Sequence, residues 1–133
     1  VEMGGEPIAV SDDMRTVYHA ALAHGANHLV TLVAQTLDML AAAGVQDPSR
    51  IARPLLTAAL DNALRQGDRA LTGPVARGDA VTLRAHMDGI PDSNTLATYR
   101  SLAQATVDRA VASGMLSSVD AEALREILGE ESI

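Results

Sequence analysis

Residues 11–44 read SDDMRTVYHAALAHGANHLVTLVAQTLDMLAAAG, and this stretch decides the fold. Ser11 is a favourable N-cap, and Asp12 and Asp13 suit the positive end of a helix. Gly44 suits a C-cap. Between these ends, apolar residues recur at helical spacing and form one broad stripe, namely Met14, Tyr18, Leu22, Leu29, Leu32, Val33, Leu37 and Leu40. The sequence therefore predicts one long helix from Ser11 to Ala43.

The opposite face of this helix carries small side chains, which are Thr16, Ala20, Ala23, Asn27, Thr31, Ala34 and Ala41. Small residues allow a second backbone to approach closely. At about 1.5 Å per residue the helix measures about 48 Å, whereas a domain of this size is roughly 35–40 Å across. We therefore expect the helix either to kink near Gly25 or to extend into a second subunit, and we expect a homodimer through the small-residue face.

Four further helices are predicted. Asp47 and Pro48 open the first of them as N-cap and first helical residue, Gly67 ends it, and Pro54 is expected to break or kink it near Arg53. The other three are expected over about 79–88, 93–113 and 118–128. A loop dense in glycine and proline is expected over Thr72–Asp79. The fold class is therefore all-α, a five-helix bundle organised around one long central helix.

The first ten residues differ from the rest. Gly4 and Gly5 read as the end of a helix, and residues 7–10 read as a short extended segment. We interpret residues 1–10 as a remnant or linker from a preceding α/β domain, and the start at Val1 as a start within a longer protein. Residues 11–129 are the helical domain, and residues 130–133 are a tail that frays.

Composition excludes several functions. The 133 residues carry 17 acidic and 10 basic side chains, a net charge of −7, which argues against a nucleic-acid partner. Cysteine and lysine are both absent, so thiol chemistry and lysine acid–base chemistry are excluded within this chain. The uncharged run from Thr16 to Leu37 is interrupted by histidines and amides, so we expect no membrane span. No signal peptide is recognisable, and a cytoplasmic location is expected.

The long helix carries three candidate sites. His24 and His28 have metal-ligand spacing, but no third ligand is evident, so we expect packed or interface histidines and no metal. Tyr18 and His19 are a possible acid–base pair, although a tyrosine on the apolar stripe also suits a core. Asn27 suits either ligand contact or a hydrogen bond between helices.

The Thr72–Asp79 stretch, TGPVARGD, is the strongest local signal. Arg77 is able to bind a carboxylate or phosphate, and Asp79 is placed to cap a helix. Gly73 and Pro74 are equally compatible with a tight structural connector, so both interpretations stand. No glycine-rich dinucleotide-binding fingerprint occurs in the chain.

Several short motifs of the chain resemble those of a known protein family. YHAA at 18–21, ANHLV at 26–30 and LTGPVARGD at 71–79, with Thr82 and His86, resemble the C-terminal domain of Rossmann-like oxidoreductases of unassigned substrate. That domain is similar to the helical C-terminal domains of 6-phosphogluconate dehydrogenase, ketopantoate reductase and pyrroline-5-carboxylate reductase. The resemblance covers about residues 5–115. It implies that NADP or NAD is bound mainly by an N-terminal domain ahead of Val1, while the helical domain supplies the substrate side of a cleft and most of a dimer interface.

The resemblance also implies site residues. It implies that Asn27 holds a substrate carbonyl or hydroxyl and that the 72–79 stretch binds substrate through Thr72, Gly73, Pro74, Arg77 and Asp79. One position departs from the pattern: hydroxyacid dehydrogenase and ketopantoate reductase relatives have a catalytic lysine four residues before the asparagine, where this chain has Ala23. His19 or Tyr18 is then the expected proton donor.

Three functions follow as alternatives. The first is the substrate-binding and dimerisation domain of an NAD(P)-dependent oxidoreductase that acts on a small carbonyl or acid. The second is a non-catalytic dimerising or ligand-sensing module, because the lysine is absent. The third, a metal-binding helical domain, depends on His24 and His28 alone.

Overall fold

The structure is a computed structural model and describes residues 9–129, which contain helices and no strand. The predicted all-α class is confirmed. The expected extended segment over residues 7–10 lies largely outside the described residues, as does the tail at 130–133. The described chain forms two compact units that divide between Thr36 and Leu37, and each unit is described by itself.

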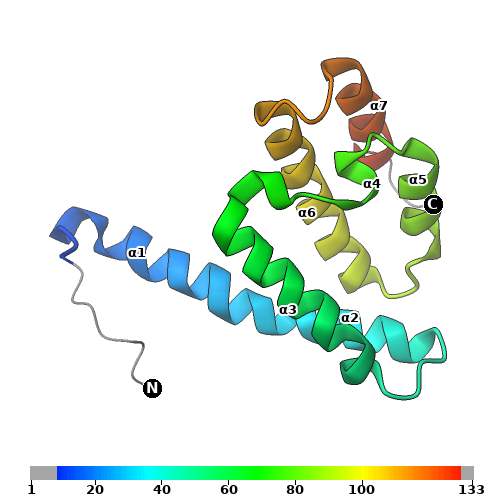
Figure 1. The fold of residues 1–133 in the computed structure, drawn as a ribbon, viewed down its shortest axis with the longest axis horizontal. Coiled ribbons are helices and arrows are strands. Elements are labelled where there is room, and N and C mark those ends of the chain that lie inside the picture. Colours follow the sequence, from blue (N-terminus) through cyan, green and yellow to red (C-terminus); the bar gives the residue numbers. More distant parts are fainter. Residues whose placement is uncertain (1–8, 130–133) are drawn as a thin grey trace. The chain divides into compact units, whose positions relative to one another are not determined.

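The first unit consists of one long helix that begins with a 3-10 turn, η1 (Asp12–Met14), and continues as α1 (Arg15–Leu22). A π-helical turn, η2 (Ala23–Asn27), follows, and α2 (His28–Ala42) begins directly after it (Figure 1). The predicted long helix is confirmed. Gly25 lies within the π-helical turn, and the expected kink near Gly25 or extension into a second subunit stays a prediction. Inserted π turns are frequent at functional sites.

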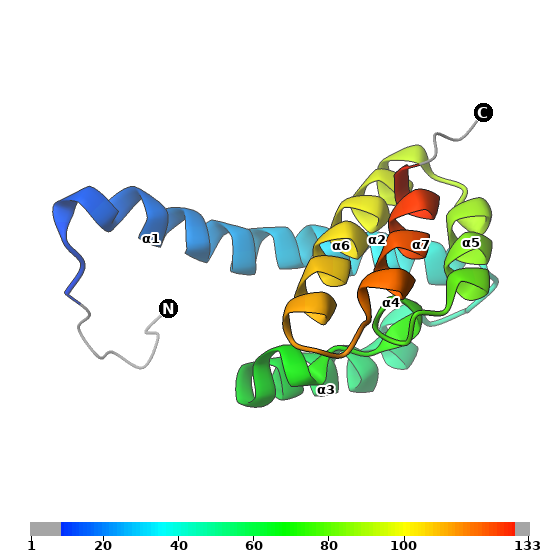
Figure 2. The same ribbon diagram turned by 90° about the horizontal axis from the view of Figure 1, so that it is seen from above.

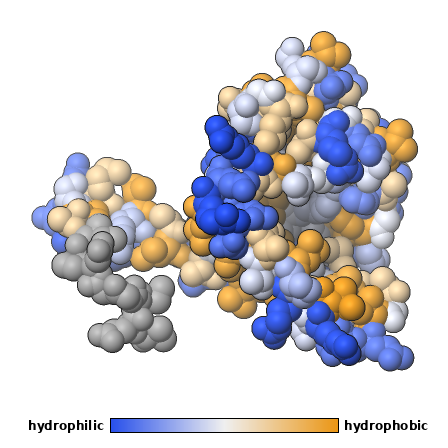
Figure 3. Space-filling model, viewed as in Figure 1, coloured by the Kyte–Doolittle hydropathy of each residue, from blue (hydrophilic) through white to orange (hydrophobic). Residues whose placement is uncertain are grey.

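The apolar stripe of this helix lies at the surface. No residue between Ala9 and Thr36 is buried, and apolar side chains are visible along this segment in Figure 3. Its exposed large hydrophobic residues are Met14, Val17, Tyr18, Leu22, Leu29, Val30 and Leu32. The buried residues of the described chain therefore lie on later elements and none lies on this helix. Helical periodicity shows which residues share a face but not what covers that face.

The second unit contains the end of α2 and all later helices. These are α3 (Pro48–Gln66), η3 (Gly67–Ala70), α4 (Gly73–Ala76), α5 (Ala80–Gly89), α6 (Ser93–Ala112) and α7 (Ser118–Gly129). Figures 1 and 2 both show α6 and α7 side by side, and α4 and α5 contact them and each other. The four later helices of the prediction are confirmed within one or two residues at each end.

The buried core of this unit comes from α4 to α7 and the loop before α7. Its fully buried large side chains are Leu83 on α5, Val107 on α6, and Leu124 and Leu128 on α7. Val75 of α4 and Leu116 of the loop complete the same cluster. Each fully buried aliphatic side chain contributes about 1.5–3 kcal/mol through removal of its surface from water. The core therefore fixes α4 and α5 against α6 and α7.

Pro54 lies inside α3 and does not break it, because the helix runs uninterrupted from Pro48 to Gln66; the break expected near Arg53 is wrong, and the alternative of a kink there stays a prediction. A proline removes one backbone hydrogen bond, and the rest of this 19-residue helix remains hydrogen-bonded. The apolar residues Ile51, Leu55 and Leu64 of α3 share helical spacing and yet are exposed, whereas Ala52 is buried. Val81 of α5 is exposed as well.

One close backbone approach joins the α4–α5 connection to α7. Gly78 has a φ of +69°, and a Cβ placed on it would lie 3.3 Å from Asp120 Oδ2 and 3.3 Å from Leu116 Cδ1. The positive φ disfavours an L side chain, and a Cβ here would require the Asp120 and Leu116 side chains to shift by a few tenths of an ångström. Glycine avoids both costs at this position.

We expect Gly78→Ala to lower the free energy of unfolding by about 1–3 kcal/mol, because a non-glycine residue is strained at this φ and the new methyl group meets α7. Gly89→Ala is the matched control: Gly89 is helical, and nothing lies within 4 Å of a Cβ placed there. It should be neutral or stabilise by up to about 1 kcal/mol. Urea denaturation of both variants measures the difference, and equal stabilities would contradict the close approach.

Candidate functional site

The TGPVARGD stretch is more ordered than the predicted loop. It contains one turn of helix, α4, between the extended residue Thr72 and the C-cap Arg77. Gly73 begins the turn with a φ of +91°, and Pro74 in the first turn needs no N–H partner there. The backbone N–H of Asp79 donates to the Pro74 carbonyl at 2.8 Å, and Val75 is buried. The stretch is therefore a compact turn anchored in the core.

Arg77 presents an exposed guanidinium beside this turn. Its side chain is 61% exposed, and its Nη2 lies 3.8 Å from Asp79 Oδ2, beyond hydrogen-bond distance. A guanidinium binds carboxylates and phosphates through paired N–H donors. Arg77 is thus placed to bind an anionic group at the surface.

Asp79 caps helix α5. Its Oδ1 accepts from the Thr82 backbone N–H at 3.0 Å, and its Oδ2 accepts from Thr82 Oγ1 at 2.7 Å. These two hydrogen bonds, together with the nearby Arg77 charge, lower the pKa of Asp79 below its ordinary value of 3.8. Both carboxylate oxygens are engaged within the chain, so Asp79 organises the turn, and its predicted contact with substrate stays a prediction.

The lowered pKa of Asp79 predicts how the stability of the fold changes with pH. A carboxyl whose pKa is lower in the folded state stabilises the fold above its ordinary pKa of 3.8, and this contribution is lost as pH falls through the folded-state value. Asp79→Asn should therefore reduce the loss of thermal stability that we expect in the wild type below about pH 4. Melting temperatures between pH 7 and pH 2 measure it.

Asp13→Asn, at an exposed carboxylate of η1 that does not cap an α-helix, is the control. Asp92, the N-cap of α6, accepts from the Thr95 backbone N–H at 2.8 Å, and its pKa is also lowered by the Thr95 hydrogen bonds. Because the pKa of Asp92 is also lowered from its ordinary value, Asp79→Asn should remove only part of the pH dependence. An unchanged pH profile in the Asp79→Asn variant would contradict the assignment.

The predicted residues of the long helix are all exposed. The rings of Tyr18 and His19 lie with centroids 5.7 Å apart at an angle of 54°. Asn27 is the last residue of the π-helical turn η2. Exposure leaves the His19 imidazole and the Asn27 amide accessible to a ligand, and it does not support the alternative of a helix–helix hydrogen bond by Asn27 within its own unit.

The predicted site residues therefore form two groups. The structure brings Thr72, Gly73, Pro74, Arg77 and Asp79 together in one turn of the second unit. It places Tyr18 beside His19 in the first unit, where Asn27 also lies. Each group is chemically coherent in itself: the first offers an anion-binding cation, and the second a proton donor and an amide.

Sequence reasoning missed a histidine–tyrosine pair. His86 Nδ1 and Tyr99 Oη are hydrogen-bonded at 2.9 Å. They border a cavity of about 440 Å³ lined by Met39, Ala85, His86, Gly89, Ile90 and Tyr99. Burial raises the pKa of Tyr99. The two residues are thirteen apart on different helices, so no local spacing pairs them, although His86 was already part of the recognised motif.

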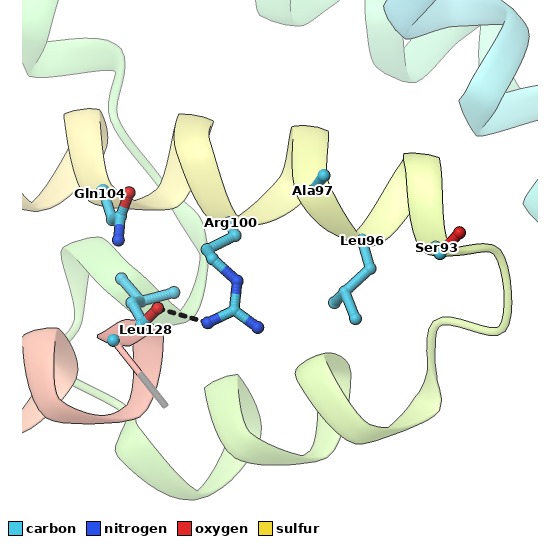
Figure 4. Close-up of a pocket in the computed structure, with 7 residues that line it drawn as sticks. Ser93, Leu96, Ala97, Arg100, Gln104 and Leu128 are labelled. Atoms are coloured by element: carbon cyan, nitrogen blue, oxygen red, sulfur yellow. Dashed lines mark hydrogen bonds between the residues drawn. The ribbon is translucent and has the colours of Figure 1, made fainter. Parts of the chain in front are cut away.

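A second hollow, of about 560 Å³, lies between α6 and the end of α7 and is lined by Ser93, Leu96, Ala97, Arg100, Gln104, Leu128 and Gly129. Figure 4 shows Arg100 reaching from α6 to the last turn of α7, where it donates to the Leu128 carbonyl. A cation at a helix C-terminus stabilises the unpaired carbonyls there. Arg100 thus has a structural role in capping α7.

Residues 9–129 lack a three-ligand metal cluster and a membrane-spanning helix. No group of three or more histidine, aspartate or glutamate side chains in this part of the chain is arranged to hold a metal ion. In the same range, no helix is both long enough and apolar enough to cross a bilayer.

The fold and motif define a class: an all-helical domain with a core-anchored TGPVARGD turn and a long, exposed amphipathic helix. Residues 1–106 match the family described as a domain of unknown function, DUF2520, and the chain belongs to that family. The family is known as a helical domain C-terminal to Rossmann-type domains. No match was found among curated proteins or solved structures.

Proposed function

We propose that this chain is the substrate-binding and dimerisation domain of an NAD(P)-dependent oxidoreductase that acts on a small carbonyl or acid substrate in the cytoplasm. The observation that carries the proposal is the family match over residues 1–106, in a family associated with Rossmann-type domains. The TGPVARGD turn supports it, because Arg77 is exposed on a rigid turn and suits a substrate carboxylate.

The proposed roles follow from side-chain chemistry. Arg77 binds the carboxylate, and Asn27 donates to or accepts from the substrate carbonyl or hydroxyl. His19, with Tyr18 beside it, gives the proton to the carbonyl oxygen as that oxygen gains charge; histidine suits this work near neutral pH. Ala23 stands where relatives of the resemblance have lysine, so the proton donor must differ from theirs.

The described residues fit a substrate better than the cofactor. They contain no strand and hence no strand–glycine-rich turn–helix unit, the arrangement that binds a dinucleotide diphosphate. In this proposal NADP or NAD is held mainly by a Rossmann-type domain and supplies the hydride. This chain supplies the substrate contacts and the proton.

The exposed long helix supports the dimerisation part of the proposal. Val17, Leu22 and Val30 are each more than half exposed, at 57%, 55% and 70%. Exposed apolar residues on a helix that buries none of its own side chains suit contact with a partner. In this proposal a second copy of the same helix packs on the small-residue face that includes Ala20, Ala23 and Ala34, where small side chains allow close approach of the two backbones.

An alternative is a dimerising or ligand-sensing module without catalysis. The observation that favours it is the absence of any lysine, and of an equivalent cation at Ala23, in a chain that otherwise keeps the motifs. In that case Arg77 and Asn27 still bind a small acid, but no proton transfer follows.

Substitution of the proposed contacts in the full-length protein tests the site. Arg77→Ala and Asn27→Ala should each raise KM by about tenfold or more, since a hydrogen bond to a charged group contributes roughly 1.5–3 kcal/mol. Melting temperatures should stay near the wild-type value, because both side chains are exposed. The assay is NADPH or NADH oxidation with a panel of small oxo acids, and Arg69→Ala, at another exposed arginine, is the control.

His19→Gln should lower kcat by roughly 10²–10⁴ with little change in KM, as expected for loss of a general acid. Substrate binding that survives without turnover in the wild type would favour the sensing module. If the Arg77 and Asn27 variants are less stable but bind and turn over substrate as the wild type does, the two residues have only a structural role.

Dimerisation is tested by sedimentation. The wild type should sediment at about twice the 13.8 kDa chain mass at tens of micromolar, and Ala23→Leu should shift the equilibrium to monomer, because the larger side chain separates the two backbones. Leu64→Ala, at an exposed apolar residue of α3, should leave assembly unchanged. A wild type that remains monomeric would refute this part of the proposal.

A further inference from the structure

His24 and His28 form a pair that the proposed function does not use. Their Nδ1 atoms lie 3.0 Å apart, and the rings meet edge to face with centroids 5.1 Å apart at 86°. His24 lies within the π-helical turn η2, and His28 is the first residue of α2. The two donor atoms thus face each other across one turn of the helix.

The distance between the two Nδ1 atoms allows both to bind the same transition-metal ion. A metal–imidazole nitrogen bond measures about 2.0–2.1 Å, so two nitrogens 3.0 Å apart both reach one ion at an N–metal–N angle of about 94°. That angle is close to the roughly 90° of octahedral and square-planar coordination, and an increase of a few tenths of an ångström in the separation gives tetrahedral geometry. No backbone movement is required.

The surroundings also admit a cation. Both histidines are exposed, so the ion keeps access to water for its remaining positions. No formally charged side chain occurs in the sequence between Arg15 and Asp38, so no nearby cation on this helix repels the ion. The net charge of −7 favours the approach of a divalent cation.

We propose that His24 and His28 form a bidentate site for one divalent ion of the nickel, copper and zinc group, with water in the remaining positions. Imidazole nitrogens suit these metals. The hydrogen bond between the rings needs a proton on one of the two Nδ1 atoms. When the metal takes that position, this ring changes tautomer and carries its proton on Nε2, so both histidines bind as neutral imidazoles through Nδ1. The proposed site has two protein ligands, and it does not depend on the proposed reductase role.

The experiment is calorimetric titration of the 133-residue chain with ZnCl₂ and, separately, NiCl₂. We expect saturable binding with one ion per chain, or one ion per two chains if a second copy supplies the other ligands; either stoichiometry supports the site. His24→Ala and His28→Ala should each weaken binding at least tenfold, because one imidazole alone gives no chelate. In NMR spectra, paramagnetic Ni²⁺ should broaden the ring signals of His24 and His28 before those of His86.

His19→Ala, at an exposed histidine on the same helix, is the matched control and should bind metal as the wild type does. Circular dichroism checks that each variant keeps its helical content, so a loss of binding is assigned to the lost ligand. The proposal is overturned if the wild type shows no saturable binding below millimolar metal, or if both single variants bind as tightly as the wild type.

Discussion

The close approach of Gly78 to α7 is the constraint on which the second unit depends. With its φ of +69° and only 3.3 Å between a Cβ placed here and the side chains of Asp120 and Leu116, this glycine lets the chain reverse close to α7. The reversal places Val75 of α4 and Leu83 of α5 in one buried cluster with Leu124 of α7. A side chain at this position is strained by the positive φ and requires Asp120 and Leu116 to shift by a few tenths of an ångström.

The same turn joins structure to proposed chemistry. Asp79 follows Gly78 directly and caps α5 through Thr82, and Arg77 precedes it with its guanidinium in solvent. Gly78 and Asp79 thus fix the backbone of the turn, and the neighbouring Arg77 remains exposed to a ligand. A binding side chain on a rigid turn loses less freedom when a ligand arrives, which favours recognition of a small anion.

The long helix presents the opposite situation. It is built from good helix formers and carries an apolar stripe, yet no residue between Ala9 and Thr36 is buried. A single helix cannot bury its own stripe, so its stability and its role both depend on what packs against it. The long helix also carries the exposed residues His19 and Asn27 and the His24–His28 pair. Whatever packs against this helix determines whether a ligand reaches them.

The sequence by itself determined the helices, because caps, glycine stops and 3.6-residue periodicity are local properties. It correctly gave the all-α class, the ends of the helices that begin at Pro48, Ala80, Ser93 and Ser118, and the special backbone of TGPVARGD. It also singled out His24 and His28 by spacing alone. These features arise from residues within a few positions of one another.

Only the tertiary structure decided which apolar faces are covered. The stripes of α3 and of the long helix look as apolar in sequence as that of α7, but only α7 lies within the buried cluster. It also revealed the His86–Tyr99 hydrogen bond across two helices and the π-helical turn that contains Gly25. Burial and long-range pairing depend on residues distant in sequence, so local sequence patterns do not predict them.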